Sequence, residues 1–294
     1  MKKIFSFYLF FLFFLVACSS GDGDDAPDPS DDDGQASVDK SQNLLATGAS
    51  ANDLLSNANF DRILVEIAYV TGFRPTPQTM DNFMQYLQER TFKQNIEVEF
   101  LELDSPEEET LTLQEIADLE GENRTAYNEG TTLAVYIYFA DAPSDGDDED
   151  EGLVTLGAVY RNTSMVIFER TIRTLAGRSL IITNTDVETA TLNHEFGHLF
   201  GLVDLGSVPV NDHEDPEAPN HCVVDGCLMQ AQLTFGSPAA RILVSSADKD
   251  LVSACSLSGQ SIMNMLESNA ARNVAVVPLL DAECILDLQN NGGR

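Results

Sequence analysis

The chain has 294 residues, and its 48 Asp and Glu against 16 Lys and Arg give a formal net charge of −32. A surface this acidic repels phosphate backbones, which argues against nucleic acid as a partner. The length is enough for one large domain or two small ones once an export segment is set aside.

Residues 1–17 begin with two lysines after the initial methionine and continue as an almost unbroken apolar run. The run is too short to span a membrane comfortably, so we predict an export signal peptide. It ends in Leu-Val-Ala-Cys, which resembles a bacterial lipobox with Cys18 as the lipid-carrying residue. This implies an exported lipoprotein, anchored to the bacterial outer membrane through lipid on Cys18. An ordinary signal peptide cleaved nearby is the alternative.

Residues 18–43 hold almost nothing that could enter a core, which predicts an acidic, disordered tether. The stretch resembles the surface-export signals of Bacteroidetes lipoproteins, and a plain spacer is an equal alternative. Residues 44–294 are then the globular part, which we divide into an N-terminal subdomain, 44–203, and a C-terminal subdomain, 204–294.

Runs rich in apolar, β-branched and aromatic residues predict strands over 62–70, 96–104, 131–141, 156–160 and 164–169. Helical spacing of apolar residues predicts helices over 76–91 and 111–124. Residues 142–152 form an acidic loop. This order of strands and helices predicts an α/β fold with helices packed on a sheet.

The stretch His-Glu-Phe-Gly-His, residues 194–198, is the strongest chemical signal. Thr185 and Glu188 fit a capping box, which predicts a helix that begins at Asp186 and runs through this stretch. On a helix, His194 and His198 lie one turn apart on the same face, so both imidazoles can bind one metal ion.

Histidine is concentrated around this helix. The chain has four histidines, at 194, 198, 213 and 221, and all lie within 28 consecutive residues. This clustering favours a metal site, and Glu195 lies close enough to reach a water at such a site.

Three side chains, two carboxylates and one imidazole, are candidates for the third ligand of the metal ion. Asp204 lies six residues after His198, and His221 begins the stretch His-Cys-Val-Val-Asp-Gly-Cys-Leu-Met. Glu217 would need a second helix, which the flanking prolines disfavour. His213 lies in a polar loop and is open as an additional ligand or as a side chain that supports one.

The segments 194–202 and 221–229 resemble the two halves of the archaemetzincin motif, here separated by 18 residues. The chain is also similar to membrane-associated metalloproteases of Bacteroidetes, including its ending over 280–294. The resemblance implies a metzincin-like fold: a twisted mixed sheet, helices that include the zinc helix, and a smaller C-terminal subdomain with a Met-turn and a closing helix, expected over 281–289.

Residue by residue, the resemblance implies that zinc binds to His194, His198 and His221, that Glu195 is the general base, and that Met229 is the Met-turn residue. Asp204 has the standard spacing of a third ligand and stays open as the alternative. We favour His221, since imidazole is the commoner zinc ligand.

The resemblance implies a zinc-dependent endopeptidase that acts on protein or peptide substrates, with segment 156–169 as the sheet edge along which substrate lies. We expect a monomer. The alternative function is a metal-stabilised surface lipoprotein that binds a partner without catalysis, and a zinc hydrolase of other substrates is also open.

The chain has five cysteines. With Cys18 lipidated, the even number that remains in an exported protein suggests two disulfides. The simplest pairing is Cys222 with Cys227 and Cys255 with Cys284, and the other two connectivities stay open. Cys222 and Cys227 are alternatively ligands of a closed structural zinc site.

Overall fold

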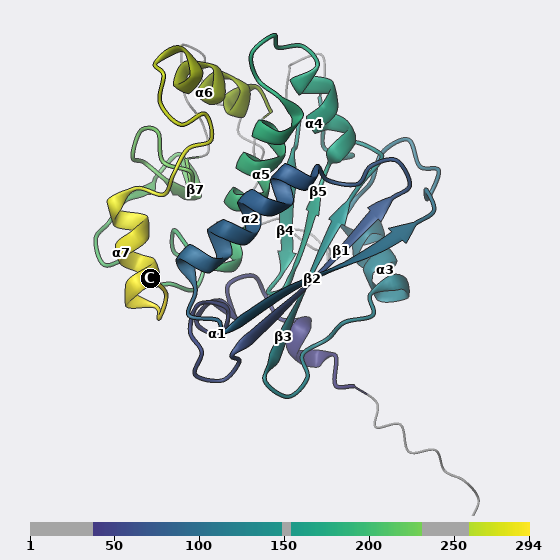
Figure 1. Ribbon diagram of the computed structural model, residues 1–294, viewed down its shortest axis with the longest axis vertical. Coiled ribbons are helices and arrows are strands. Elements are labelled where there is room, and N and C mark those ends of the chain that lie inside the picture. Colours follow the sequence, from purple (N-terminus) through teal and green to yellow (C-terminus); the bar gives the residue numbers. More distant parts are fainter. Residues whose placement is uncertain (1–37, 149–153, 231–258) are drawn as a thin grey trace, which may run out of the picture. The chain divides into compact units, whose positions relative to one another are not determined.

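The computed structural model describes residues 38–148, 154–230 and 259–294 (Figure 1). The signal peptide, Cys18, most of the tether and Cys255 lie outside these residues. The folded unit begins at Val38, ahead of residue 44, with a short 3-10 helix, Ser41–Asn43. Asn43 is buried, and its side-chain amide donates to the Ala134 carbonyl at 3.0 Å.

A five-stranded sheet forms the centre of the fold. Its strands are β1 (Arg62–Val70), β2 (Asn95–Leu103), β3 (Thr132–Phe139), β4 (Gly157–Arg161) and β5 (Ser164–Ile167), in the order β2-β1-β3-β5-β4. The neighbouring pairs are parallel except β4 and β5, which are antiparallel. The predicted α/β class and mixed sheet are therefore confirmed, and β4 lies at one edge.

Strand position in the sheet follows the sequence pattern. The central strands β1 and β3 are almost continuously apolar, because helices or loops cover both of their faces. The edge strand β2 alternates apolar with acidic residues, and most of its side chains are partly or fully exposed. Charged side chains on such an edge discourage pairing with another chain.

The helices divide between the two faces of the sheet (Figure 1). They are α1 (Ala51–Leu55), α2 (Pro77–Arg90), α3 (Leu113–Asn123), α4 (Glu169–Ala176) and α5 (Asn184–Leu199). The helices α2 and α5 pack into the larger apolar core, where Phe83 and Phe196 meet edge to face at 5.2 Å between ring centroids. Ile116 and Ala117 of α3 pack into the smaller core, on the opposite face.

The start of α5 differs from the prediction. Asp186 donates its backbone N–H to Thr183 Oγ1 at 3.2 Å, and its carboxylate accepts from the Thr183 N–H at 2.8 Å. The predicted capping box of Thr185 and Glu188 is therefore wrong. Glu188 is instead buried, and its carboxylate accepts from the Thr76 N–H at the beginning of α2 at 3.0 Å, which offsets part of the cost of burying it.

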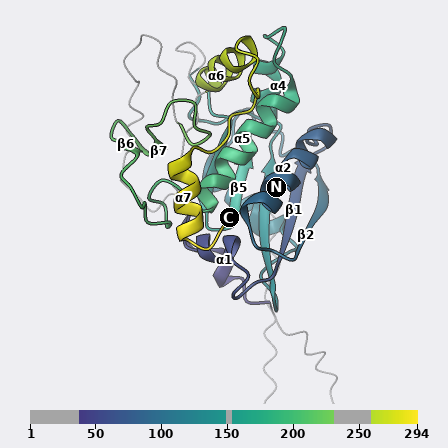
Figure 2. The same cartoon turned by 60° about the vertical axis from the view of Figure 1, so that its left-hand side comes forward.

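The C-terminal part is smaller and irregular. It contains a two-stranded hairpin, β6 (Glu214–Asp215) and β7 (Ala218–Cys222), and the helices α6 (Gly259–Ala271) and α7 (Ala282–Asn290). In both views α7 and the hairpin lie on the side of the sheet that carries α5 (Figure 1, Figure 2). The predicted closing helix is confirmed as α7. Among the described residues, none of the helices is both long and apolar enough to cross a membrane.

Candidate metal centres

Three histidines converge at one buried point. His194 and His198 come from consecutive turns of α5, and His221 comes from the end of β7. All three are almost completely buried, and one ring nitrogen of each lies within 4.8 Å of the others. The Nε2 atoms of His194 and His198 are 3.2 Å apart. This is a set of three imidazoles that could hold one metal ion.

Backbone carbonyls fix the orientation of two of these rings. His194 Nδ1 lies 2.7 Å from the Leu228 carbonyl oxygen, and His221 Nδ1 lies 2.9 Å from the Pro219 carbonyl oxygen. A carbonyl can only accept, so each Nδ1 carries the proton and each Nε2 carries a lone pair. Metal-ligating histidines are commonly held in this way.

Burial keeps these rings neutral. Burial, followed by the nearby His221 imidazole, lowers the pKa of His194 to about 3. Burial and the neighbouring imidazoles hold the pKa of His198 well below its usual range, and burial also lowers the pKa of His221. Since the neutral imidazole is the form that binds metal, the three rings are ready to coordinate an ion at neutral pH.

Glu195 and Met229 lie next to this cluster on different sides of α5. Glu195 is fully buried beside β4, where its side chain packs against Gly157. Met229 is fully buried in the turn after β7, and its sulfur packs so tightly against Gly197 that no Cβ would fit there. The structure thus brings both residues to the helix turn that carries His194 and His198.

The two acidic candidates for the third ligand lie elsewhere. Asp204 is exposed, with a φ of 65°, and is not part of the histidine cluster. The chain reverses just before it at Gly201, whose φ of 75° ends the helix. Glu217 is exposed in the hairpin turn between β6 and β7. Of the three candidates, the geometry brings only His221 to the paired imidazoles.

A second cluster of metal-binding side chains was not anticipated as a set. His213, Cys222, Asp281 and Cys284 have ligand atoms within 4.8 Å of one another. Cys222 Sγ lies 3.2 Å from His213 Nδ1 and 3.1 Å from Asp281 Oδ2. Cys227 adjoins the set, with its Sγ 3.7 Å from Cys284 Sγ.

The predicted disulfides are not formed in this part of the chain. Cys222, Cys227 and Cys284 are free and buried, so the pairings of Cys222 with Cys227 and of Cys255 with Cys284 are corrected. The thiols of Cys222 and Cys284 instead lie next to His213, which the sequence left open as an additional ligand or as a side chain that supports one. Hydrogen bonds from Cys222 and Cys284 lower the pKa of Cys227, which favours a thiolate within the cluster.

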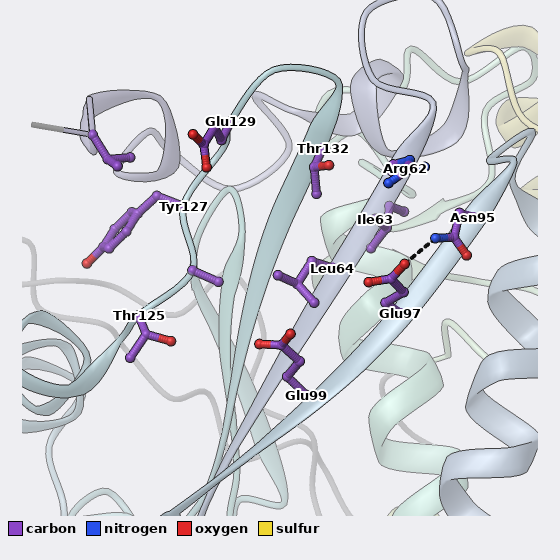
Figure 3. A pocket seen from close by; sticks show the side chains of 12 residues that line it. Arg62, Ile63, Leu64, Asn95, Glu97, Glu99, Thr125, Tyr127, Glu129 and Thr132 are labelled. Carbon is purple, nitrogen blue, oxygen red and sulfur yellow. Dashed lines mark hydrogen bonds between the residues drawn. The ribbon is translucent and has the colours of Figure 1, made fainter. Parts of the chain in front are cut away.

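A separate cavity lies away from both clusters. It has a volume of about 420 Å³ and opens between the beginnings of β1, β2 and β3 and the loop over 125–129 (Figure 3). Its polar lining includes Arg62, Glu97, Glu99 and Glu129, and it contains neither histidine nor cysteine. This cavity therefore offers none of the imidazole or thiol donors that the two clusters hold.

No protein-family model matches the chain, and no curated protein matches it. Among solved structures, the chain is similar to the crystal structure of archaemetzincin from Methanopyrus kandleri, with 15% sequence identity and a TM-score of 0.45. The match covers 79% of this chain and 96% of that chain. The proposal for the two clusters therefore rests on the geometry of their own side chains.

Proposed function

We propose that this chain is a zinc-dependent endopeptidase. The observation that carries the proposal is the convergence of three buried, neutral imidazoles, those of His194, His198 and His221, with Glu195 adjacent on the same helix. Three imidazoles suit zinc and leave a coordination position open, which is the pattern of catalytic rather than structural zinc sites. Zinc held there would lower the pKa of a water and polarise a carbonyl group.

Glu195 is the general base in this proposal. Its carboxylate accepts a proton from the attacking water and then delivers that proton to the departing amine. The fully buried position of Glu195 supports this role, because a carboxylate shielded from solvent transfers protons within a fixed geometry. A site that only stabilised the fold would have no use for such a carboxylate.

The edge strand β4 is the proposed platform for the substrate. Among the described residues, β4 pairs with β5 alone, so its other side would offer backbone donors and acceptors to an extended peptide. Gly157, at the start of β4, packs against Glu195, which supports delivery of a peptide bond from this edge to the general base.

The cluster around Cys222 is proposed as a separate, structural metal site. Its donors would be the imidazole of His213, the thiols of Cys222 and Cys284 and the carboxylate of Asp281, with the Cys227 thiol adjoining. Thiolate and imidazole are the donors of closed structural zinc sites. The site would tie the segment that carries His221 to the closing helix α7.

Export, lipidation of Cys18 and attachment to the outer membrane belong to the same proposal. They rest on the sequence of residues 1–37. A peptidase tethered in this way would act on proteins or peptides at the membrane surface.

The test is hydrolysis of casein and of a peptide library by the purified zinc-loaded protein, with Glu195→Ala and Glu195→Gln as matched variants. We expect cleavage by the wild type that a chelator abolishes and zinc restores, and at least about a 100-fold lower kcat for both variants. If wild type and variants bind zinc equally and are equally inert, the protein is a non-catalytic metal-stabilised lipoprotein instead.

A further inference from the structure

Gly157 faces the zinc helix from the edge strand. It is the first residue of β4, is buried, and is paired with Ile167 of β5. Alternate residues of a strand point to opposite faces, and Val159, two residues on, packs in the core that contains α5. Gly157 therefore belongs to the row of β4 positions that is turned toward α5.

A side chain at position 157 would collide with the proposed general base. A Cβ atom there would lie 2.7 Å from Glu195 Cγ and 3.2 Å from Glu195 Cδ. It would also lie 3.0 Å from Thr191 Cγ2, one helical turn before Glu195. Distances below about 3 Å are not tolerated between carbon atoms, so the Glu195 side chain would have to move.

The backbone does not require glycine at this position. The φ of Gly157 lies outside the left-handed region, so an alanine could adopt the same conformation. Glycine inside a strand costs about 0.5 to 1 kcal/mol relative to alanine, because it loses more chain entropy on folding. What position 157 needs is the absence of a side chain.

We propose that Gly157 is a positioning residue for Glu195. The space beside the Gly157 backbone holds the Glu195 side chain between the edge strand and α5, and so fixes where the carboxylate lies. This rests on the proposed function, in which Glu195 is the general base, and adds a residue that decides its placement.

A small displacement of Glu195 should be costly for catalysis. The backbone of α5 is packed by α2, through Phe83 and Phe196, and by Met229 against Gly197, so the helix cannot shift to absorb the collision. A misplacement of about 1 Å in a catalytic group can cost on the order of 100-fold in rate.

The first experiment measures catalysis by Gly157→Ala. We expect kcat to fall by at least about 10-fold with KM changed far less, while the zinc content equals that of the wild type. Gly121→Ala is the matched control: Gly121 lies in α3 on the opposite face, and a Cβ there meets nothing within 4 Å. Thr191→Ser, which removes the methyl group at 3.0 Å, should partly restore kcat in the Gly157→Ala background.

The second experiment measures the same contact without activity, as a double-mutant cycle in unfolding free energy. Gly157→Ala should destabilise the wild-type chain, and most of that loss should disappear in a Glu195→Ala background, because Cγ and Cδ are then gone. Gly121→Ala should have the same effect in both backgrounds. Equal destabilisation by Gly157→Ala in both backgrounds, or an unchanged kcat for that variant, overturns the proposal.

Different results would contradict the peptidase function and the positioning role of Gly157. A wild-type chain that never cleaves peptides removes the proposed function, while the unfolding cycle still reports whether Gly157 sets the position of Glu195. A wild-type chain that cleaves, together with a Gly157→Ala variant of full kcat, removes the positioning role alone.

Discussion

His213 and Asp287 form a buried pair, with His213 Nε2 2.7 Å from Asp287 Oδ2. Because the carboxylate accepts, Nε2 carries the proton and the lone pair of Nδ1 is directed at Cys222 Sγ, 3.2 Å away. Many metal-binding histidines are held in this way: one ring nitrogen donates to a carboxylate, and the other ring nitrogen faces the metal site. Asp287 therefore orients His213 toward the thiol cluster.

Replacing Asp287 should loosen this second site. In Asp287→Ala we expect zinc at the thiol cluster to be released about 10 to 100 times more readily to a competing chelator, because the ring loses its orientation. Asp287 also accepts from the Val210 N–H at 2.7 Å, so some stability will be lost as well. Glu283→Ala, at a partly exposed position in the first turn of the same helix, is the control and should retain both metals. Equal zinc release by both variants would contradict the orienting role.

The three thiols should be protected by metal rather than by oxidation. We expect about two zinc ions per chain, and no alkylation of Cys222, Cys227 or Cys284 by iodoacetamide until a strong chelator is added. Mass spectrometry of the alkylated peptides reads out each cysteine separately. Thiols that stay unreactive with chelator and become reactive only after a reductant would show a disulfide instead. Cys284→Ser should leave one zinc and lower the unfolding midpoint.

The third ligand can be assigned with two substitutions. His221→Ala should weaken zinc binding at the histidine cluster by more than about 100-fold, since removing a ligand costs more than removing the side chain that supports one. Asp204→Ala should leave zinc content and peptidase activity near wild type, because Asp204 is exposed and apart from the cluster. Loss of zinc from Asp204→Ala, with His221→Ala unaffected, would reverse the assignment.

Much of the fold could be read from local patterns. The strand over 62–70 was predicted with the bounds that β1 has, because a buried parallel strand is marked by its own apolar run. The helix α2 was equally clear, since Thr76 and Pro77 signal its start. The hairpin β6–β7 was missed, because its polar sequence carries no alternation of apolar residues.

The candidate sites were predictable only in part. His194 and His198 share a helix, so their spacing alone brings them together. The position of His221 depends on how the preceding 18 residues fold, and the position of Cys284 depends on where α7 packs. The sequence could therefore only rank the candidate ligands and the cysteine pairings. Export suggested disulfides, whereas the structure places Cys222 against His213 and Asp281. Contacts between distant segments decided this chemistry.

A buried pair of glutamates lies near the start of α5. Glu169 is fully buried at the beginning of α4, and Glu188 is fully buried in α5. Asn184 donates to both carboxylates, at 3.1 Å to Glu169 and 2.5 Å to Glu188, and Arg173 donates to Glu169 at 2.5 Å. Burial, and then the negative charge of Glu188, raise the pKa of Glu169 to about 8.

This pair predicts a loss of stability as the pH rises. Between its ordinary pKa near 4.5 and the raised value of about 8, Glu169 keeps its proton in the folded chain and loses it in the unfolded chain. The folded state then binds more protons, so the free energy of unfolding falls across this window and levels off above it. In Glu169→Gln the free energy of unfolding should fall less with pH. The stability of this variant relative to the wild type should therefore rise by a few kcal/mol between pH 5 and pH 9. Urea unfolding at several pH values measures this, with the exposed Glu108→Gln as control. Parallel pH profiles for wild type and Glu169→Gln would show that Glu169 is ionised in the folded chain at neutral pH.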